Sequence, residues 1–447
     1  MPASKRPFMG ATPFDGGVTF RVWSVFANNI AVAGTFNGWS QTADALFPEG
    51  NGMWSVDVNG AKVDDQYKFV VTSPFAPSGI WKNDPYARAM TQSNGNSVVA
   101  DSNFTWEATG YNTPSWNEAV IYEIHVGSFK FEPAAGAATG YQRGTFQTVI
   151  SKLDYLQDLG INAIEIMAAG EFPFDYSWGY NQSYMFAIEN LYGGPNGFRQ
   201  MVDEAHKRGI AVIFDVVFNH IGPNDCDLWQ FDGWGQNGGG IYFYNDWRKS
   251  TPWGDNRPDY GRGEVRQYLR DCGVRWLQQR FCDGLRWDAT GWIRNVVGAN
   301  NDPAHDIADG WSLLQWINNE TIGAQPWKIS IAEDMQQNPW LTKNIDSGGA
   351  GFTSQWDAGF VHPIRQAIIP ADDSGRDMFA VKNAVELRYN SDAFGRVIYT
   401  ESHDENANGH QRVPEEIWPG NASSYYIIRE SARRWARRWC SLRREFR

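Results

Sequence analysis

Short runs rich in β-branched and aromatic residues follow one another over the first hundred positions. Residues 18–23 (VTFRVW) and 66–71 (QYKFVV) are clear examples, and turn pairs such as Asn37-Gly38 and Asn51-Gly52 separate these runs. Asn-Gly pairs favour the two-residue turns of β-hairpins. The pattern predicts an all-β sandwich over residues 1–105, followed by a polar, turn-rich linker over residues 106–117.

Beyond residue 117, short apolar runs alternate with amphipathic helical stretches. Such alternation indicates βα units around a parallel sheet. The expected strands cover residues 120–126, 163–167, 211–218, 284–288, 329–333, 352–356 and 397–400. Seven strands of this kind, each followed by polar residues, favour a (β/α)8-type barrel over residues 118–432. A polar, aromatic segment over residues 221–263 is predicted to be a loop insertion.

The pattern of an eighth barrel strand is missing after the last of these runs. Residues 433–447 instead carry seven Arg and no strand pattern, although the chain as a whole is acidic. We expect a truncated or frame-shifted reading of a longer parent, with a basic interaction arm as the alternative. A seven-stranded open barrel would leave strand edges uncovered, which threatens stability.

Charge and aromatic content narrow the class of ligand. The formal net charge is -12, whereas nucleic-acid binding depends on Lys and Arg side chains that neutralise phosphates. We therefore expect no nucleic-acid partner. The chain contains 22 Trp, 18 Tyr and 26 Phe residues, and flat aromatic rings stack well on the apolar faces of sugars. This composition favours a carbohydrate ligand.

Cysteine spacing and hydropathy bear on the compartment. The four Cys residues form no C-x-x-C pair, so neither a zinc knuckle nor a redox motif is indicated. No apolar run follows Lys5 and Arg6, and no stretch approaches 18 consecutive apolar residues. We expect a cytoplasmic monomer without a membrane partner.

Acidic residues recur in or just after four of the predicted strands: Asp215, Asp288, Glu333 and Asp404. A lone acid at such a place is usually a helix cap or an ion-pair partner, but a barrel brings these strand ends into one pocket. Glycoside cleavage needs two carboxyl groups that flank the scissile bond. Arg286 lies two residues before Asp288, points to the same side of its strand and can hold that carboxylate ionised.

In their order and spacing, these four segments resemble the signature regions of the α-amylase superfamily of glycoside hydrolases and transglycosylases. The resemblance implies that Asp288 is the nucleophile, Glu333 the general acid/base and Asp404 the acid that distorts the sugar in the reacting subsite. It further implies supporting, substrate-binding positions for Asp215, His220, Arg286 and His403, and a structural one for Asn219. It implies no organic cofactor. Some relatives bind calcium near the position of Asn219, but no cluster of oxygen ligands is evident here, so no metal site is expected.

Two further segments extend the resemblance. Trp178-Gly179-Tyr180 resembles the stretch after the second strand in glycogen branching enzymes, and implies that Tyr180 stacks on the sugar in the reacting subsite; core packing is the alternative. Residues 8–100 resemble the starch-binding β-sandwich that precedes the barrel in branching, debranching and trehalose-releasing members. Trp39 and Trp54 are candidates for glucan stacking there, or for core or interdomain packing.

The sequence therefore predicts an enzyme that resembles 1,4-α-glucan branching enzymes, acts on glycogen, amylose or maltooligosaccharides and retains configuration. An α-glucan hydrolase of the same superfamily, such as an α-amylase, a debranching enzyme or a trehalose-releasing enzyme, is the first alternative. A non-catalytic glucan-binding protein is the second, because the predicted barrel is incomplete.

Overall fold

A computed structural model describes residues 2–133, 141–174, 176–222, 226–278, 282–370, 373–407 and 409–417. The chain forms two compact units, Met1–Ser330 and Ile331–Arg447. The predicted Arg-rich tail, residues 433–447, lies outside the described residues. The predicted domain boundaries stay predictions.

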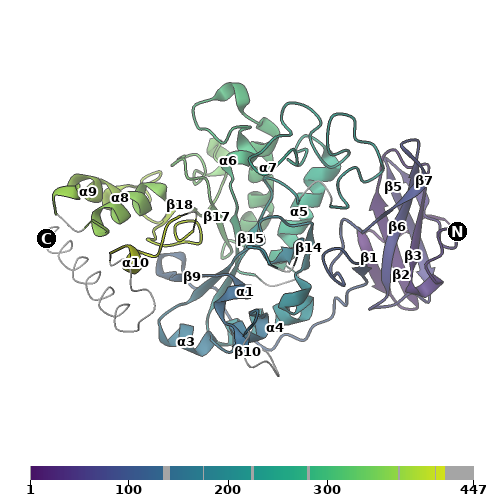
Figure 1. The fold of residues 1–447 in the computed structure, drawn as a ribbon, viewed down its shortest axis with the longest axis horizontal. Helices are drawn as coiled ribbons and strands as arrows, with labels where there is room; N and C mark the ends of the chain where they lie inside the picture. Colours follow the sequence, from purple (N-terminus) through teal and green to yellow (C-terminus); the bar gives the residue numbers. More distant parts are fainter. Residues whose placement is uncertain are drawn as a thin grey trace. The chain divides into compact units, whose positions relative to one another are not determined.

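The first unit opens with the expected all-β sandwich (Figure 1). One sheet has the order β1-β2-β5-β4, and the other has the order β3-β6-β7 with β8 paired to β6. The strands are β1 (Gly10–Phe14), β2 (Gly17–Trp23), β3 (Asn29–Gly34), β4 (Phe47–Gly50), β5 (Met53–Asn59), β6 (Gln66–Ser73), β7 (Ala76–Lys82) and β8 (Ser97–Val98). Asn51 and Gly52 both have positive φ, as the tight turn between β4 and β5 requires.

Parallel strands follow in the same unit. They are β9 (Ile121–Ile124), β12 (Ala163–Ile166), β15 (Ala211–Val216), β16 (Gly284–Trp287) and the beginning of β17 (Ile329–Ala332). They lie side by side in sequence order. The short strand pairs β10 (Glu132–Pro133) with β11 (Tyr141–Gln142) and β13 (Gly170–Glu171) with β14 (Tyr184–Ile188) are antiparallel.

Helices of the first unit pack on this sheet. They are α1 (Val126–Phe129), α2 (Phe146–Ile150), α3 (Leu153–Asp158), α4 (Gly194–Lys207), α5 (Gly263–Gln278), α6 (Gly291–Arg294) and α7 (Ala308–Asn318). Phe214 of β15 stacks on Trp276 of α5, with ring centroids 4.0 Å apart, and also contacts Phe198 of α4. Because side chains alternate along a strand, the next residue, Asp215, points to the opposite, inner face.

The second unit continues the parallel series. Here β18 (Ser354–Trp356) pairs with the end of β17 and with β19 (Arg396–Val397). The helices α8 (Ala358–Ile368), α9 (Met378–Glu386) and α10 (Val413–Ile417) enclose an apolar core that includes Ile364, Ile368 and Val381. The seven parallel strands run in chain order, which confirms a (β/α)8-type barrel preceded by a β-sandwich. Each is shorter than predicted by one to three residues, and β19 also begins one residue earlier than predicted.

The predicted insertion contains turns and isolated bridges, but no strand or helix, between residues 226 and 262. Its contacts with the sandwich are close: Tyr242 packs edge-on against Trp23, and Asp232 accepts a hydrogen bond from the Phe26 amide at 3.1 Å. Ser73 also donates to the Asp232 carbonyl at 2.5 Å. The insertion therefore joins the sandwich to the barrel strands of the first unit.

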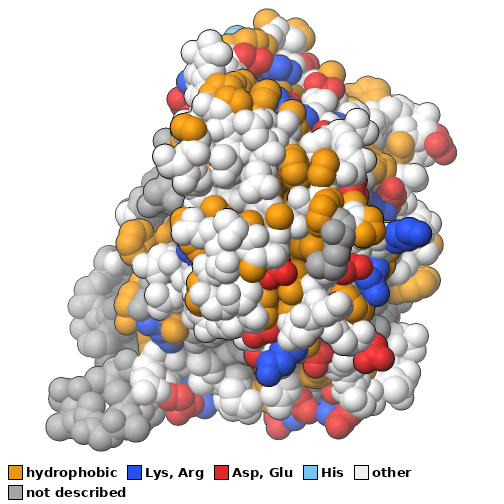
Figure 2. Space-filling model, turned by 90° about the vertical axis from the view of Figure 1, so that its right-hand side faces the viewer, with side chains coloured by type: hydrophobic (Ala, Val, Ile, Leu, Met, Phe, Trp, Pro, Cys, Tyr) orange, Lys and Arg blue, Asp and Glu red, His pale blue; other side chains and the backbone are white. Residues whose placement is uncertain are grey.

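The face of the molecule that carries the sandwich shows no large patch in which all charged side chains have the same sign. In Figure 2, hydrophobic side chains lie in separate groups, with Lys, Arg, Asp and Glu side chains interspersed between them. Such a surface suits a neutral ligand better than a polyanion.

Candidate active site

Asp288 lies at the carboxyl end of β16, directly after Trp287. Its amide donates to the Val216 carbonyl at 3.0 Å, which ties it to the end of β15. Only 8% of the residue is exposed. Ala289, the next residue, has a φ of 42°, a left-handed conformation that is costly for a residue with a Cβ atom. The chain thus turns sharply where the candidate nucleophile stands.

Arg286 joins two carboxylates of this site. Its Nη1 lies 2.8 Å from Oδ2 of Asp215 and 3.0 Å from Oδ1 of Asp288. The register pairs Asp215 with Arg286 on neighbouring strands, so the contact follows from the sheet itself. Both Arg286 and Asp215 are fully buried. Attraction between opposite charges is strong where water is excluded, and it holds the Asp288 carboxylate in one orientation.

Burial raises the pKa of Asp215 to about 7. The Arg286 guanidinium opposes this rise, Asp288 adds to it, and a hydrogen bond from Tyr180 opposes it. That bond runs from the Tyr180 hydroxyl to Oδ2 of Asp215 at 2.6 Å. Two carboxyl groups therefore share one guanidinium, and the hydroxyl of Tyr180 supplies the additional donor.

Tyr180 is held in place by the glycine before it. Gly179 has a φ of 97°, and a Cβ atom there would lie 1.6 Å from the Ala168 carbonyl oxygen, so only glycine fits. This close approach presses the loop against the residues that follow β12. Burial and the charge of Asp215 raise the pKa of the Tyr180 hydroxyl well above its usual value, which keeps it a neutral donor.

Asn219 and His220 complete the group around Asp288. Nδ2 of Asn219 donates to Oδ2 of Asp288 at 2.8 Å, and Nδ1 of His220 lies 2.5 Å from Oδ1 of Asn219. A carboxylate only accepts hydrogen bonds, which fixes the orientation of the Asn219 amide and requires the proton on Nδ1 of His220. Asn219 is thus a direct partner of the nucleophile as well as a loop residue.

Trp253 of the insertion stacks on His220, with ring centroids 4.7 Å apart and planes inclined by 11°. The residue is 46% exposed. Nothing in the sequence pattern indicated this contact, because an irregular loop has no periodicity that places its side chains. Trp253 fixes the plane of the His220 ring from outside the barrel strands.

Burial lowers the pKa of His220 to about 4, although the nearby Asp288 opposes this. An unfolded histidine takes up its proton near its ordinary value of 6.5. Between these values the unfolded chain binds a proton that the folded chain does not, so stability falls as the pH drops through this window. The loss is complete below pH 4 and amounts to about 3 kcal/mol.

We expect His220→Gln to remove this pH dependence. Urea unfolding at pH 7, 5.5 and 4 should show that the parent loses about 3 kcal/mol more of its unfolding free energy than the variant. His410→Gln, at an exposed position, is the matched control and should follow the parent. If the unfolding free energy fell equally with pH in the parent and in His220→Gln, His220 would be charged in the folded chain.

The second unit carries the other candidate catalytic residues. Glu333 directly follows β17 and is half-buried. His403 and Asp404 lie together, with Nε2 of His403 3.6 Å from Oδ1 of Asp404, and the Asp404 side chain is 50% exposed. The His403 ring lies 6.2 Å from that of Trp356, at the end of β18. The catalytic roles of these residues stay predictions.

The two tryptophans proposed for the sandwich have different surroundings. Trp39 lies 6.2 Å from Trp81, measured between ring centroids. The Trp54 indole donates to the Ser24 carbonyl at 3.1 Å. Both are partly buried. Trp81, which is 39% exposed, was not among the predicted residues and extends the aromatic surface beside Trp39. Glucan binding by Trp39 and Trp54 stays a prediction.

Among the described residues, no group of three or more His, Cys, Asp or Glu side chains is arranged to hold a metal ion. No helix in the described part of the chain is both long and apolar enough to cross a membrane.

Two family models match this chain. Residues 86–232 match the α-amylase catalytic domain. Residues 8–87 match carbohydrate-binding module 48, the isoamylase N-terminal domain. These two segments therefore resemble an α-amylase catalytic domain that is preceded by a carbohydrate-binding module.

Individual relatives agree with this assignment. The chain is 31% identical over 353 residues to malto-oligosyltrehalose trehalohydrolase of Saccharolobus solfataricus, across 78% of this chain and 55% of that protein. It is 30% identical over 375 residues to the 1,4-alpha-glucan branching enzyme of Corynebacterium jeikeium, across 79% of this chain and 50% of that protein. A crystal structure of a putative alpha amylase from Salmonella typhimurium superposes with a TM-score of 0.65 at 27% sequence identity. The superposition covers 81% of this chain and 56% of that chain. The chain thus spans about half the length of the curated relatives it matches.

Proposed function

We propose that this protein is a 1,4-α-glucan branching enzyme-like transglycosylase that works by retaining double displacement. The observation that carries the proposal is the buried Asp288 carboxylate, held by Arg286 at 3.0 Å and by Asn219 at 2.8 Å. One oxygen of the carboxylate faces a cation and the other a neutral amide. This arrangement orients the carboxylate for nucleophilic attack.

In the first step, an Asp288 oxygen attacks the anomeric carbon of an α-1,4-linked glucose residue. The bond from this carbon to the leaving oxygen breaks, and Glu333 transfers its proton to that oxygen. The product is a glycosyl ester on Asp288. In the second step, the 6-hydroxyl of a glucan attacks the same carbon, the ester bond breaks, and Glu333 takes the hydroxyl proton. Two inversions retain the configuration.

The remaining residues position the reacting sugar. We infer that Tyr180 stacks on it, and that Asp404, His403 and His220 bind its hydroxyls, as the superfamily resemblance implies. We propose an α-glucan such as glycogen, amylose or a maltooligosaccharide as substrate, and the cytoplasm as location.

A hydrolase is the second candidate, and the similarity to a trehalohydrolase favours it. Water then replaces the 6-hydroxyl in the second step. The choice depends on acceptor contacts rather than on Asp288 or Glu333, because both reactions share the first step.

Incubation with amylose separates the two candidates. We expect linkage analysis to find new α-1,6 linkages with no matching rise in reducing ends. Asp288→Asn is the control for uncatalysed change and should give neither product. Rising reducing ends without new branches would establish the hydrolase, and no product from the parent chain would point to a glucan-binding protein without activity.

A further inference from the structure

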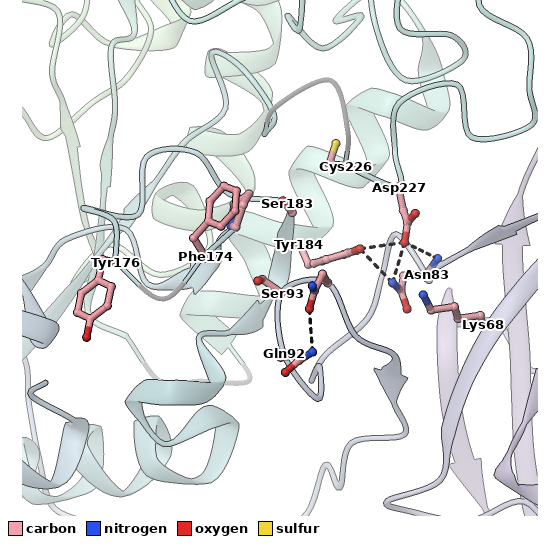
Figure 3. Close-up of a pocket in the computed structure, with 12 residues that line it drawn as sticks. Lys68, Asn83, Gln92, Ser93, Phe174, Tyr176, Ser183, Tyr184, Cys226 and Asp227 are labelled. Carbon is pink, nitrogen blue, oxygen red and sulfur yellow. Dashed lines mark hydrogen bonds between the residues drawn. The ribbon is translucent and has the colours of Figure 1, made fainter. Parts of the chain in front are cut away.

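A cavity of about 700 Å³ lies in the first unit, and Asp288 is not among its described lining residues (Figure 3). Its walls come from three places: the sandwich and the segment after it, the segment between β13 and β14 with the start of β14, and the insertion. The lining residues include Lys68, Asn83, Gln92, Phe174, Tyr176 and Asp227. Its volume lies in the range of small-molecule binding sites.

Asp227 is the fixed polar group of this cavity. Its Oδ2 accepts three hydrogen bonds, from the Asn83 amide at 2.9 Å, from Nδ2 of Asn83 at 2.7 Å and from the Tyr184 hydroxyl at 2.9 Å. Figure 3 shows this network. In the part of the chain that the structure describes, Oδ1 receives no hydrogen bond. A carboxylate that is held on one oxygen and open on the other suits a ligand that donates hydroxyl groups.

Two aromatic side chains of the lining are exposed to an unusual degree. Phe174 is 77% exposed and Tyr176 is 83% exposed. Phe174 also has a φ of 66°, a conformation that costs free energy for such a residue. The Arg143 guanidinium lies 4.7 Å from the centroid of the Tyr176 ring, which helps to hold that ring. Exposed flat rings beside polar groups are typical of surfaces that bind sugars.

The charge of the cavity selects the class of ligand. Among the lining residues that the structure describes, Lys68 and Asp227 are the charged ones, with one charge of each sign, and most other polar groups are amides and hydroxyls. A phosphorylated or strongly cationic ligand would need an excess of opposite charge, which these residues do not provide. A neutral chain with many hydroxyl groups and apolar ring faces matches both the polar and the aromatic lining.

The position of the cavity connects it with the candidate active site. Tyr176 is four residues from Tyr180, whose hydroxyl contacts Asp215, and four residues span at most about 14 Å. We propose that this cavity is a remote binding site for an α-1,4-glucan chain, which it anchors while another part of the chain reaches Asp288. The choice of an α-glucan rests on the proposed function, whereas the neutral polyhydroxylated class rests on the cavity alone.

The test uses the full chain carrying Asp288→Asn, so that binding is measured without turnover. Maltoheptaose is titrated while amide hydrogen exchange is followed in two segments, residues 90–96 at the cavity and residues 284–290 at the candidate nucleophile. We expect exchange to slow in residues 90–96. Adding Tyr176→Ala or Phe174→Ala should raise the maltoheptaose concentration for half-protection of this segment by roughly tenfold.

Both substitutions remove exposed side chains, so the fold should survive them. Phe379→Ala, at an aromatic residue that is 80% exposed in the second unit, is the matched control and should leave protection of residues 90–96 unchanged. No slowing in residues 90–96 at saturating maltoheptaose would overturn the site. Slowing in residues 284–290 reports active-site binding separately, so failure of this site and failure of the proposed function are distinguishable.

Discussion

Replacing Asp288 by Asn should lower turnover on amylose by on the order of 10⁴-fold or more, because the amide cannot form the glycosyl ester. The fold should remain, since Arg286 keeps its contact with Asp215 at 2.8 Å and the site loses one of two like charges. Steady-state rates and thermal unfolding of purified protein measure the two effects.

The matched control for this substitution is Asp64→Asn. Asp64 is exposed and has a φ of 71°, which asparagine tolerates well. Its variant should turn over like the parent. If Asp288→Asn kept more than about a tenth of the parent rate, covalent catalysis by Asp288 would be excluded, because a single essential nucleophile does not leave so much activity.

Replacing Glu333 by Gln should affect two substrates differently. Cleavage of a glucan needs a proton on the leaving oxygen, so its rate should fall by roughly 10²–10⁴-fold. A glycosyl fluoride has a leaving group that departs without a proton, so formation of the ester from it should fall far less. Pre-steady-state release of fluoride, compared with the initial rate on amylose, measures the difference.

Glu386→Gln is the control for this experiment, because Glu386 is an exposed glutamate of the same unit. It should retain both rates. An equal loss on both substrates in Glu333→Gln would show that Glu333 does not act as the acid.

The fold followed from the sequence because its signals are periodic. Short runs of β-branched and aromatic residues between turn pairs predicted the sandwich, and apolar runs between amphipathic stretches predicted the parallel strands in their correct order. The strand ends were less accurate: β15 ends at Val216, whereas the apolar run continues to Phe218. The residues after Val216 stay buried although their strand pairing stops. An apolar run in the sequence indicates burial, and it does not indicate where backbone hydrogen bonding ends.

The first half of the site was also predictable, because strand register dictates it. Asp215 and Arg286 lie opposite each other in the register of β15 and β16, and Arg286 and Asp288 share a strand side. The contact of Trp253 with His220 was not predictable, since it depends on the path of an irregular insertion. The same holds for the cavity around Asp227, whose walls come from three distant parts of the chain.

The amide of Asn219 illustrates a third case. The superfamily resemblance implied a structural position for Asn219, whereas its side chain contacts both Asp288 and His220. A motif identifies the residue type, but the hydrogen-bond partners of a side chain depend on neighbours that the motif does not contain. Such partners become visible only when the strands are assembled.

The formation of a glycosyl ester on Asp288 is the central claim, and it can be observed directly. Glu333→Gln protein is mixed with an α-maltosyl fluoride, digested and analysed by mass spectrometry. The ester should form without the acid and persist without the base. We predict one added maltosyl group on the peptide that contains Asp288, absent when Asp288→Asn is also present. A maltosyl group on any other residue, or on none while fluoride is released, would contradict the account.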